Sequence, residues 1–134
     1  MIYVDANYWI YWFDQRLPEH KYVLKTMREA LLEGVVLNLV TIVEVAHYLR
    51  YLDEKDFLDK LNRMQSLTSL KLVNLDTELL NLALKQLVKY AKVGIGGRDS
   101  VILATMQALK VKRILTHDKV FTKIKGLEVI DPIP

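Results

Sequence analysis

Cysteine is absent from this sequence of 134 residues. A disulfide framework, a zinc–thiolate or iron–sulfur site and a cysteine nucleophile are therefore excluded. The longest apolar stretch, residues 35–49, is interrupted by polar residues that include Asn38 and Glu44, so we expect no segment that spans a membrane. Met1 leads directly into a strand-like run without the basic, apolar and small-residue order of a signal peptide, so we expect a cytoplasmic protein.

Glycine and proline are scarce, with five and three residues respectively, and no internal repeat, linker or low-complexity tract is visible. A chain of this length suits one domain, so we expect a single domain over residues 1–134. Folding should bury roughly two-thirds of the extended-chain surface, which is enough for a core that needs no metal or disulfide.

Positive charge exceeds negative charge only slightly, with 19 Lys and Arg against 16 Asp and Glu. The distribution is more informative than the total. Within residues 110–125, where Asp118 is the only acid, the basic residues are Lys110, Lys112, Arg113, Lys119, Lys123 and Lys125. This segment predicts either a solvated basic surface or a site for an anionic partner.

Short apolar runs alternate with segments of helical periodicity along the chain. Strands are expected at residues 2–4, 35–40, 70–75, 113–116 and 127–130. Helices are expected directly after residue 5 and at residues 19–33, 41–52, 53–66, 77–90 and 99–109, with a short helix or turn at 118–123. Alternating strands and helices favour a parallel sheet covered on both faces. The sequence therefore predicts a three-layer α/β/α sandwich around a central parallel sheet of about five strands.

Four acidic residues are expected at the edge of this sheet where the carboxyl ends of the strands meet. Asp5, Glu44 and Asp118 follow the first, second and fourth strands. Asp99 follows a glycine-rich loop that can bring it to the same edge. Each acid also has a purely structural interpretation. Asp5 and Asp118 suit helix N-caps. Thr41 and Glu44 have the spacing of a capping box, and Asp99 suits a first helical turn.

The joint pattern of acids favours a metal site over four unrelated caps, because converging carboxylates repel one another unless cations neutralise them. Hard oxygen ligands suit Mg²⁺ or Mn²⁺, whereas three scattered histidines without cysteine give little support for zinc. One or two such ions favour phosphodiester hydrolysis. With the four acids paired to metal, 19 basic groups face 12 remaining acids, an excess that suits a polyanion bound through its phosphates.

The acids lie in four segments that form a wider pattern. The segments are Ile-Tyr-Val-Asp-Ala-Asn at 2–7, Thr-Ile-Val-Glu-Val at 41–45, Asp-Ser-Val-Ile-Leu-Ala-Thr at 99–105 and Thr-His-Asp-Lys-Val-Phe at 116–121. In order and spacing they resemble the motifs of the PIN-domain ribonucleases, especially the VapC-type toxins of toxin–antitoxin pairs. Those motifs are D-x-N/S, a helix-borne Glu, D-A/S-x-I-x-A and T-x-D-x-x-F. No single motif is specific, but the four together are.

The resemblance implies a catalytic site of four metal-binding acids and two polar supports, with Mg²⁺ or Mn²⁺ as the cofactor. The acids are Asp5, Glu44, Asp99 and Asp118, and the supports are Asn7 and Thr116. Some relatives carry a further acid before the final Phe, where this chain has Val120, so the choice between one metal and two stays open. The resemblance also implies an RNA substrate, a cognate antitoxin protein and a homodimer.

Three basic residues flank the predicted acids and are candidates for contacts with RNA phosphates. They are Arg98, His117 and Lys119, each of which also suits a solvated surface. His47 lies three residues after Glu44 on the same predicted helix face. Proton transfer or RNA contact is one interpretation of His47, but we expect it to pack.

The predicted first helix is rich in aromatic side chains. They are Tyr8, Trp9, Tyr11, Trp12 and Phe13. Because they surround the whole helical turn, one buried face cannot hold them all. We expect part of this set, including Tyr8 and Tyr11, to line a groove for an antitoxin peptide, with a core role as the alternative.

These observations predict a divalent-metal-dependent endoribonuclease, and the small size favours the toxin of a toxin–antitoxin pair. An RNA-processing or ribosome-maturation nuclease of the same fold is one alternative, and a non-catalytic RNA-binding module is another. A binding module has no need for negative charge where phosphates dock. A receiver domain also gathers acids around Mg²⁺, but it needs an acidic pair after the first strand, where this sequence has only Asp5.

Overall fold

Five strands form one parallel sheet in the order β3-β2-β1-β4-β5 in the computed structural model, which describes residues 1–134. They are β1 (Ile2–Val4), β2 (Val35–Asn38), β3 (Leu70–Val73), β4 (Arg113–Leu115) and β5 (Glu128–Ile130). In the central strand β1, Tyr3 pairs with Val36 on one side and with Ile114 on the other. The predicted sheet is confirmed, although each strand after the first is one or two residues shorter than expected.

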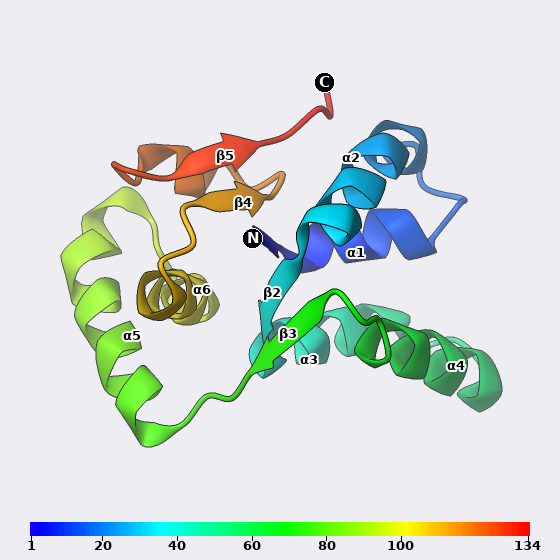
Figure 1. The fold of residues 1–134 in the computed structure, drawn as a ribbon, viewed down its shortest axis with the longest axis horizontal. Helices are drawn as coiled ribbons and strands as arrows, with labels where there is room; N and C mark the ends of the chain where they lie inside the picture. The colour runs from blue at the N-terminus through cyan, green and yellow to red at the C-terminus, as the bar shows by residue number, and fades with distance from the viewer.

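Six α-helices cover the two faces of the sheet. They are α1 (Ala6–Phe13), α2 (His20–Glu33), α3 (Leu39–Leu49), α4 (Glu54–Gln65), α5 (Thr77–Tyr90) and α6 (Gly97–Leu109), with two short 3₁₀ segments, η1 (Ala91–Val93) and η2 (Lys119–Lys123). Helices α1 to α4 lie on one face, and α5 and α6 lie on the other (Figure 1). Crossovers between parallel strands are right-handed, so the direction in which the chain moves across the sheet decides which face its helices cover. The chain moves in one direction from β1 to β3 and in the other from β3 to β5, and the helices of these two parts therefore cover opposite faces. The predicted three-layer α/β/α sandwich is confirmed.

The middle of the sheet contains a topological switch point. From β1 the chain continues to β2, whereas β4, the other neighbour of β1, is reached only after the long crossover from β3. The connections that leave β1 and β4 therefore diverge, and open α/β sheets bind ligands in the crevice formed there. Asp5 directly follows β1 and Thr116 directly follows β4, so both lie at this crevice.

The hydrophobic core lies on both faces of β1 and β2, whose residues are all buried. On one face the core is filled by Trp9 of α1 and Met27 of α2, and on the other by Met106 of α6. Residues 100–106 of α6 are all buried because this helix lies between the sheet and α5. None of the helices combines the length and apolar character that a membrane span requires.

The start of α3 differs from the expectation. The helix begins at Leu39 because the side chain of Asn38 caps it, accepting a hydrogen bond from the N–H of Val40 at 3.0 Å. Thr41 therefore lies inside the helix, and its hydroxyl is hydrogen-bonded to that of Tyr3 at 2.6 Å. The predicted capping box of Thr41 and Glu44 is wrong, since the cap lies three residues before Thr41.

The aromatic residues of α1 divide between the core and its margin. Tyr8 and Trp9 are fully buried, and their polar atoms bind Asp131 and the carbonyl of Val4 at 2.6 and 3.2 Å. The expectation that Tyr8 contacts a partner is wrong, because no partner can reach a buried ring. Tyr11 is half-buried, as are the last two aromatic residues of the helix.

Candidate active site

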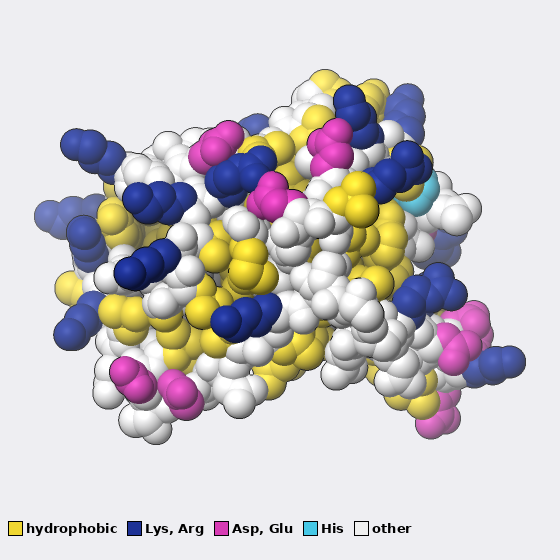
Figure 2. All heavy atoms as spheres, viewed as in Figure 1, with side chains coloured by type: hydrophobic (Ala, Val, Ile, Leu, Met, Phe, Trp, Pro, Cys, Tyr) yellow, Lys and Arg dark blue, Asp and Glu magenta, His cyan; other side chains and the backbone are white.

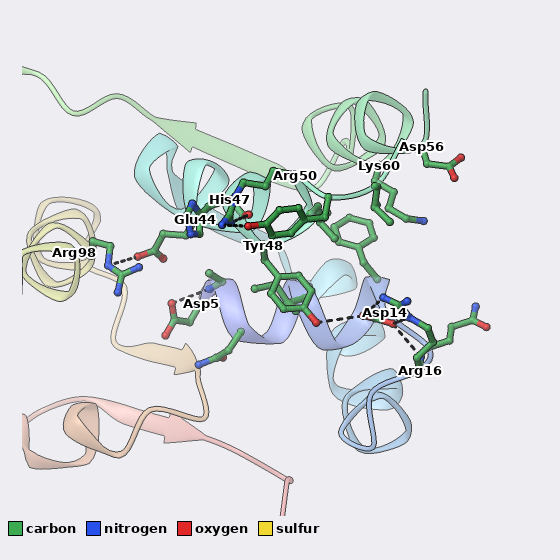
Figure 3. Close-up of a pocket in the computed structure, with 18 of the residues that line it drawn as sticks. Asp5, Asp14, Arg16, Glu44, His47, Tyr48, Arg50, Asp56, Lys60 and Arg98 are labelled. Carbon is green, nitrogen blue, oxygen red and sulfur yellow. Dashed lines mark hydrogen bonds and ion pairs between the residues drawn. The ribbon is translucent and has the colours of Figure 1, made fainter. Parts of the chain in front are cut away.

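The crevice at the switch point opens into a cavity of about 1050 Å³. The four predicted acids line it from four elements: Asp5 as the cap of α1, Glu44 in α3, Asp99 in the first turn of α6 and Asp118 as the cap of η2. Figure 3 shows Arg98 of α6 directed at Glu44 of α3, with Asp5 beside them at the start of α1. The fold thus brings together acids that are up to 113 positions apart in the chain.

Asp5 is the most deeply buried of these acids, with 7% of its surface exposed. Its Oδ1 accepts a hydrogen bond from the N–H of Ala6 at 2.8 Å, and its Oδ2 accepts one from the hydroxyl of Thr116 at 2.7 Å. Burial raises the pKa of Asp5 despite these bonds, and the charges of Asp99 and Asp118 raise it further. A carboxylate in such surroundings is stabilised by a nearby cation.

Thr116 joins the ends of β1 and β4. Its buried hydroxyl donates to Asp5 and accepts from the N–H of Asp118 at 3.1 Å, so one side chain holds two of the acids. Asn7 acts on the same segment, because its Oδ1 accepts a hydrogen bond from the N–H of His117 at 3.4 Å. These contacts are what a supporting role for Thr116 and Asn7 requires.

Glu44 projects from α3 into the cavity, and its side chain is 13% exposed. Burial raises the pKa of Glu44 to about 7, with Arg98 opposing the shift and Asp5 and Asp99 adding to it. The Nε of Arg98 lies 2.9 Å from Oε1 of Glu44, and the rest of the arginine is largely exposed. A carboxyl group that titrates near neutral pH in a cleft is typical of a functional site.

The side chains of Asp99 and Asp118 also accept hydrogen bonds from backbone N–H groups at the N-termini of helices. Oδ2 of Asp99 accepts a hydrogen bond from the N–H of Gly96 at 3.0 Å, and Oδ1 of Asp118 accepts one from the N–H of Val120 at 3.0 Å. The cap interpretation is therefore confirmed for Asp118, as it is for Asp5, and Asp99 lies in the first turn of α6 as expected. A carboxylate has about four lone-pair sites, so one capping bond leaves capacity for a further ligand.

The donor set at the cavity fits a hard divalent cation in its chemistry, because it consists of carboxylates without sulfur. Burial raises the pKa of Asp99, and the charge of Asp118 adds to that shift, so the acids carry an electrostatic cost that a cation relieves. In the structure, no three His, Asp or Glu side chains lie close enough together to hold a metal ion without rearrangement. Their oxygens are engaged instead by Arg98, Thr116 and backbone N–H groups.

The three basic residues predicted to contact RNA lie in two places. Arg98 lines the cavity. His117 and Lys119 face Asp131 instead, with Nδ1 and Nζ at 2.7 and 3.2 Å from its Oδ2, and neither lines the cavity. Contact with RNA stays a prediction for all three.

His47 is exposed and lines the cavity. The expected packing role is wrong, because His47 shares the helix face of Glu44, which is turned toward the cavity and away from the sheet. His47 is thus available to a ligand in the cavity.

Sequence reasoning missed Asp131, whose side chain is only 8% exposed. It accepts a hydrogen bond from the hydroxyl of Tyr8 at 2.6 Å and binds His117 and Lys119. Through His117 it ties the end of the chain to the segment that carries Thr116. The rule that selects acids after parallel strands also selects Asp131, which directly follows β5.

Sequence reasoning also missed a cluster of polar residues at the far end of the cavity. There Arg16 makes a two-pronged bond to the buried Asp14, with Nε and Nη2 at 2.9 and 3.0 Å from the carboxylate, and the hydroxyl of Tyr48 donates to the same group at 3.3 Å (Figure 3). The hydrogen bonds from Arg16 lower the pKa of Asp14. No spacing in the sequence indicates this cluster, because it depends on α3 packing against α1.

The model of the PIN domain family matches residues 2–127. The chain belongs to the PIN domain family. Comparison with curated proteins finds no match. Among solved structures, this PIN domain is similar in fold to Mycobacterium tuberculosis VapC20, a toxin that cleaves the sarcin–ricin loop, with a TM-score of 0.81 and 16% identity over 96% of this chain and 98% of that chain.

Two further solved structures have the same fold as this PIN domain. VapBC2 from Rickettsia felis, bound to a DNA fragment from its promoter, has a TM-score of 0.75 and 15% identity. FitAcB from Neisseria gonorrhoeae has a TM-score of 0.75 and 21% identity. In both comparisons, 98% of each chain is covered. The identities are low, so these likenesses establish a shared fold and nothing beyond it.

Proposed function

We propose that this chain, as a single PIN-like nuclease domain over residues 1–134, is a divalent-metal-dependent endoribonuclease that hydrolyses RNA phosphodiester bonds in the cytoplasm. The supporting observation is the convergence of Asp5, Glu44, Asp99 and Asp118 on one cavity at the switch point. Four acids at one cavity are unfavourable in a protein that only binds RNA, because their negative charges repel phosphates.

The proposal assigns Mg²⁺ or Mn²⁺ to the four acids. When bound, such an ion activates water and stabilises the leaving oxygen of a phosphodiester. Thr116 holds the orientation of Asp5 and Asp118 through its single hydroxyl. Glu44 must lose its proton to act as a ligand, and Arg98 favours that loss.

Arg98 and Asn7 have complementary roles in this site. The exposed Arg98 keeps donors that the Glu44 contact does not use, because a guanidinium carries five N–H groups, and these suit a phosphate oxygen. Asn7 holds the backbone of His117 and so limits movement of the segment that carries Asp118. Positioning of this kind contributes to rate by fixing the reacting groups before the reaction.

The toxin of a toxin–antitoxin pair is the biological role that we propose for this nuclease. It is supported by structural neighbours that were solved as toxin–antitoxin complexes, including the complex from Klebsiella pneumoniae. The proposal includes a cognate antitoxin and a homodimer. A short neighbouring reading frame whose product co-purifies with this chain supports it, whereas its absence favours an RNA-processing or ribosome-maturation nuclease.

Calorimetric titration with Mn²⁺ and Mg²⁺ tests the site without a choice of substrate. Wild type is expected to bind metal, and Asp5→Asn and Asp99→Asn are expected to lose binding while remaining folded. Asp59→Asn is the matched control, because Asp59 is exposed on α4 and outside the cavity. Cleavage of a fluorophore-labelled RNA pool should then follow metal binding across these variants. RNA binding by wild type without cleavage in either metal contradicts the nuclease and favours the binding module.

A further inference from the structure

The basic run near the C-terminus is divided by the fold into paired and unpaired residues. Arg113 forms ion pairs with Glu33 and Glu128, and Lys119 lies 3.2 Å from Asp131. These two residues are therefore largely neutralised by their own protein. The remaining lysines are the ones whose charge is available to an external anion.

Three of the remaining lysines meet a lysine of α5 in a second groove, with a volume of about 700 Å³. The four residues of this lysine groove are Lys89, Lys110, Lys112 and Lys125. None of them forms a salt bridge, and no acidic residue lines the groove. In Figure 2, Lys and Arg side chains gather over α5 and α6, whereas acidic side chains lie near β4 and β5 and at the lower end of α5.

The lysine groove lies far from the carboxylates. Lys110 follows the last residue of α6, whereas Asp99 lies in its first turn, so roughly 16 Å of helix separates them at 1.5 Å per residue. Lys112 precedes β4 and Lys125 precedes β5, which places the groove at the amino edge of the sheet, opposite the candidate active site. A small ligand in the groove therefore does not contact the cavity.

The chemistry of the lysine groove suits the phosphates of a nucleic acid. Uncompensated ammonium groups act as point charges for phosphate, and a recessed row of them follows a strand better than a flat surface. The ring of Tyr90 lines the same groove, with Nζ of Lys89 at 5.2 Å from its centre, and offers its other face to a base. The amides of Gln86 and Gln107 also line the groove, and they are hydrogen-bonded to each other. Its floor includes the apolar Leu103 and Met106.

A positive site away from the acids also has an electrostatic reason. The cavity edge carries four carboxylates, which repel an approaching polyanion until metal neutralises them. Basic residues of the cavity such as Arg50, Lys60 and Arg98 offset part of this repulsion, and a positive site elsewhere on the surface adds attraction at longer range. We propose that the lysine groove binds phosphates of the RNA substrate at a distance from the scissile bond, so that the enzyme favours RNA long enough to reach both sites. This inference rests on the proposed nuclease function.

Substrate length provides the first test. Wild type and the double variant Lys112→Gln/Lys125→Gln are compared on two randomised RNA pools, one of 3 and one of about 40 nucleotides. These positions leave Lys110 untouched, because it holds the left-handed C-cap of α6 at φ 56°. The variant should lose kcat/KM on the long pool, through KM, and keep wild-type kcat/KM on the short pool, which cannot reach both sites.

Salt dependence of binding provides the second test, on the Asp99→Asn background so that RNA is not consumed. Each phosphate contact with a single strand contributes about 0.7 to the slope of log K against log salt, so the loss of two contacts should reduce the affinity change between 50 and 200 mM salt about sevenfold. Lys21→Gln/Lys25→Gln is the matched control, since it removes equal charge from exposed positions of α2.

The outcomes separate the two proposals. Equal kcat/KM and equal salt slopes for the groove variant and the α2 control overturn the lysine groove and leave the nuclease intact. Loss of 40-mer binding in the groove variant, with no cleavage by wild type, supports the groove and contradicts the nuclease. Unchanged 40-mer binding together with lost binding to vesicles of anionic phospholipid overturns the RNA assignment in favour of a membrane surface.

Discussion

Arg98 and Glu44 form an ion pair across the candidate active site, with Nε of the arginine 2.9 Å from Oε1 of the glutamate. The pair joins α6 to α3, two helices on opposite faces of the sheet. Even so, burial is the larger influence, and the pKa of Glu44 is raised to about 7. In the metal-free protein, Arg98 is therefore paired with a glutamate that is partly protonated at neutral pH.

Replacing Arg98 with methionine should raise the pKa of Glu44 further, because the arginine charge is what opposes the effect of burial. Metal binding requires the deprotonated glutamate, so its pH midpoint should move upward in Arg98→Met. Calorimetric Mn²⁺ titration between pH 5.5 and 8.5 measures that midpoint. Arg28→Met, at an exposed position of α2, is the control and should keep the wild-type midpoint. An unchanged midpoint in Arg98→Met contradicts the prediction.

The metal-free protein should become more stable as the pH falls from 8 toward 5. The folded pKa of Glu44 is about 7 against an ordinary value of 4.5, so the folded state binds a proton that the unfolded chain has released. Burial raises the pKa values of Asp5 and Asp99 as well, which adds to the same trend. Urea unfolding in a chelator at pH 8 and pH 5.5 measures the difference. Glu44→Gln should reduce it, and an equal difference in wild type and variant would falsify the assignment to Glu44.

Thr116→Val should destabilise the protein by about 1–3 kcal/mol, because it leaves Oδ2 of the buried Asp5 carboxylate without its hydrogen-bond donor. It also removes the acceptor for the N–H of Asp118, so metal affinity should fall with stability. Urea unfolding and Mn²⁺ titration measure the two effects. Thr68→Val is the control, since Thr68 is exposed, and it should change stability by less than about 0.5 kcal/mol.

Asp131→Asn should destabilise the protein by about 1–3 kcal/mol at neutral pH. Burial works to raise the pKa of Asp131, but hydrogen bonds from Tyr8, His117 and Lys119 outweigh it and leave the pKa below its usual range. A lowered carboxyl pKa contributes stability above the unfolded value, and that contribution is lost as the pH falls through the folded value. The difference between wild type and variant should therefore shrink in acid. A constant difference from pH 7 to pH 3 contradicts this account.

Local rules predicted most of the secondary structure, because the periodicity and caps of this chain agree with its tertiary fold. The start of α3 is an instructive exception. Periodicity places it at Thr41, but Asn38 can both end β2 and cap the helix, and the hydroxyl contact of Thr41 with Tyr3 involves a residue 38 positions away. Contacts of that range have no signature in a local window.

The candidate site was predictable in its residue types and less so in its geometry. The carboxyl-edge rule found the acids, since parallel strands deliver their following residues to one edge. The same rule applied to β5 selects Asp131, which sequence reasoning passed over. The exposure of His47 and the burial of Tyr8 could not be read from the helix pattern, because each depends on which neighbour covers that face.

The sequence by itself determined the class of this protein: a parallel α/β sandwich without cysteine chemistry, with four acids assigned to one sheet edge. The tertiary structure alone decided which charges stay unpaired. Arg98 turns to Glu44, Lys119 turns to Asp131, and four lysines from separate elements share a groove without an acid. Charge pairing depends on distances of a few ångströms between elements far apart in the chain, and only packing sets those distances.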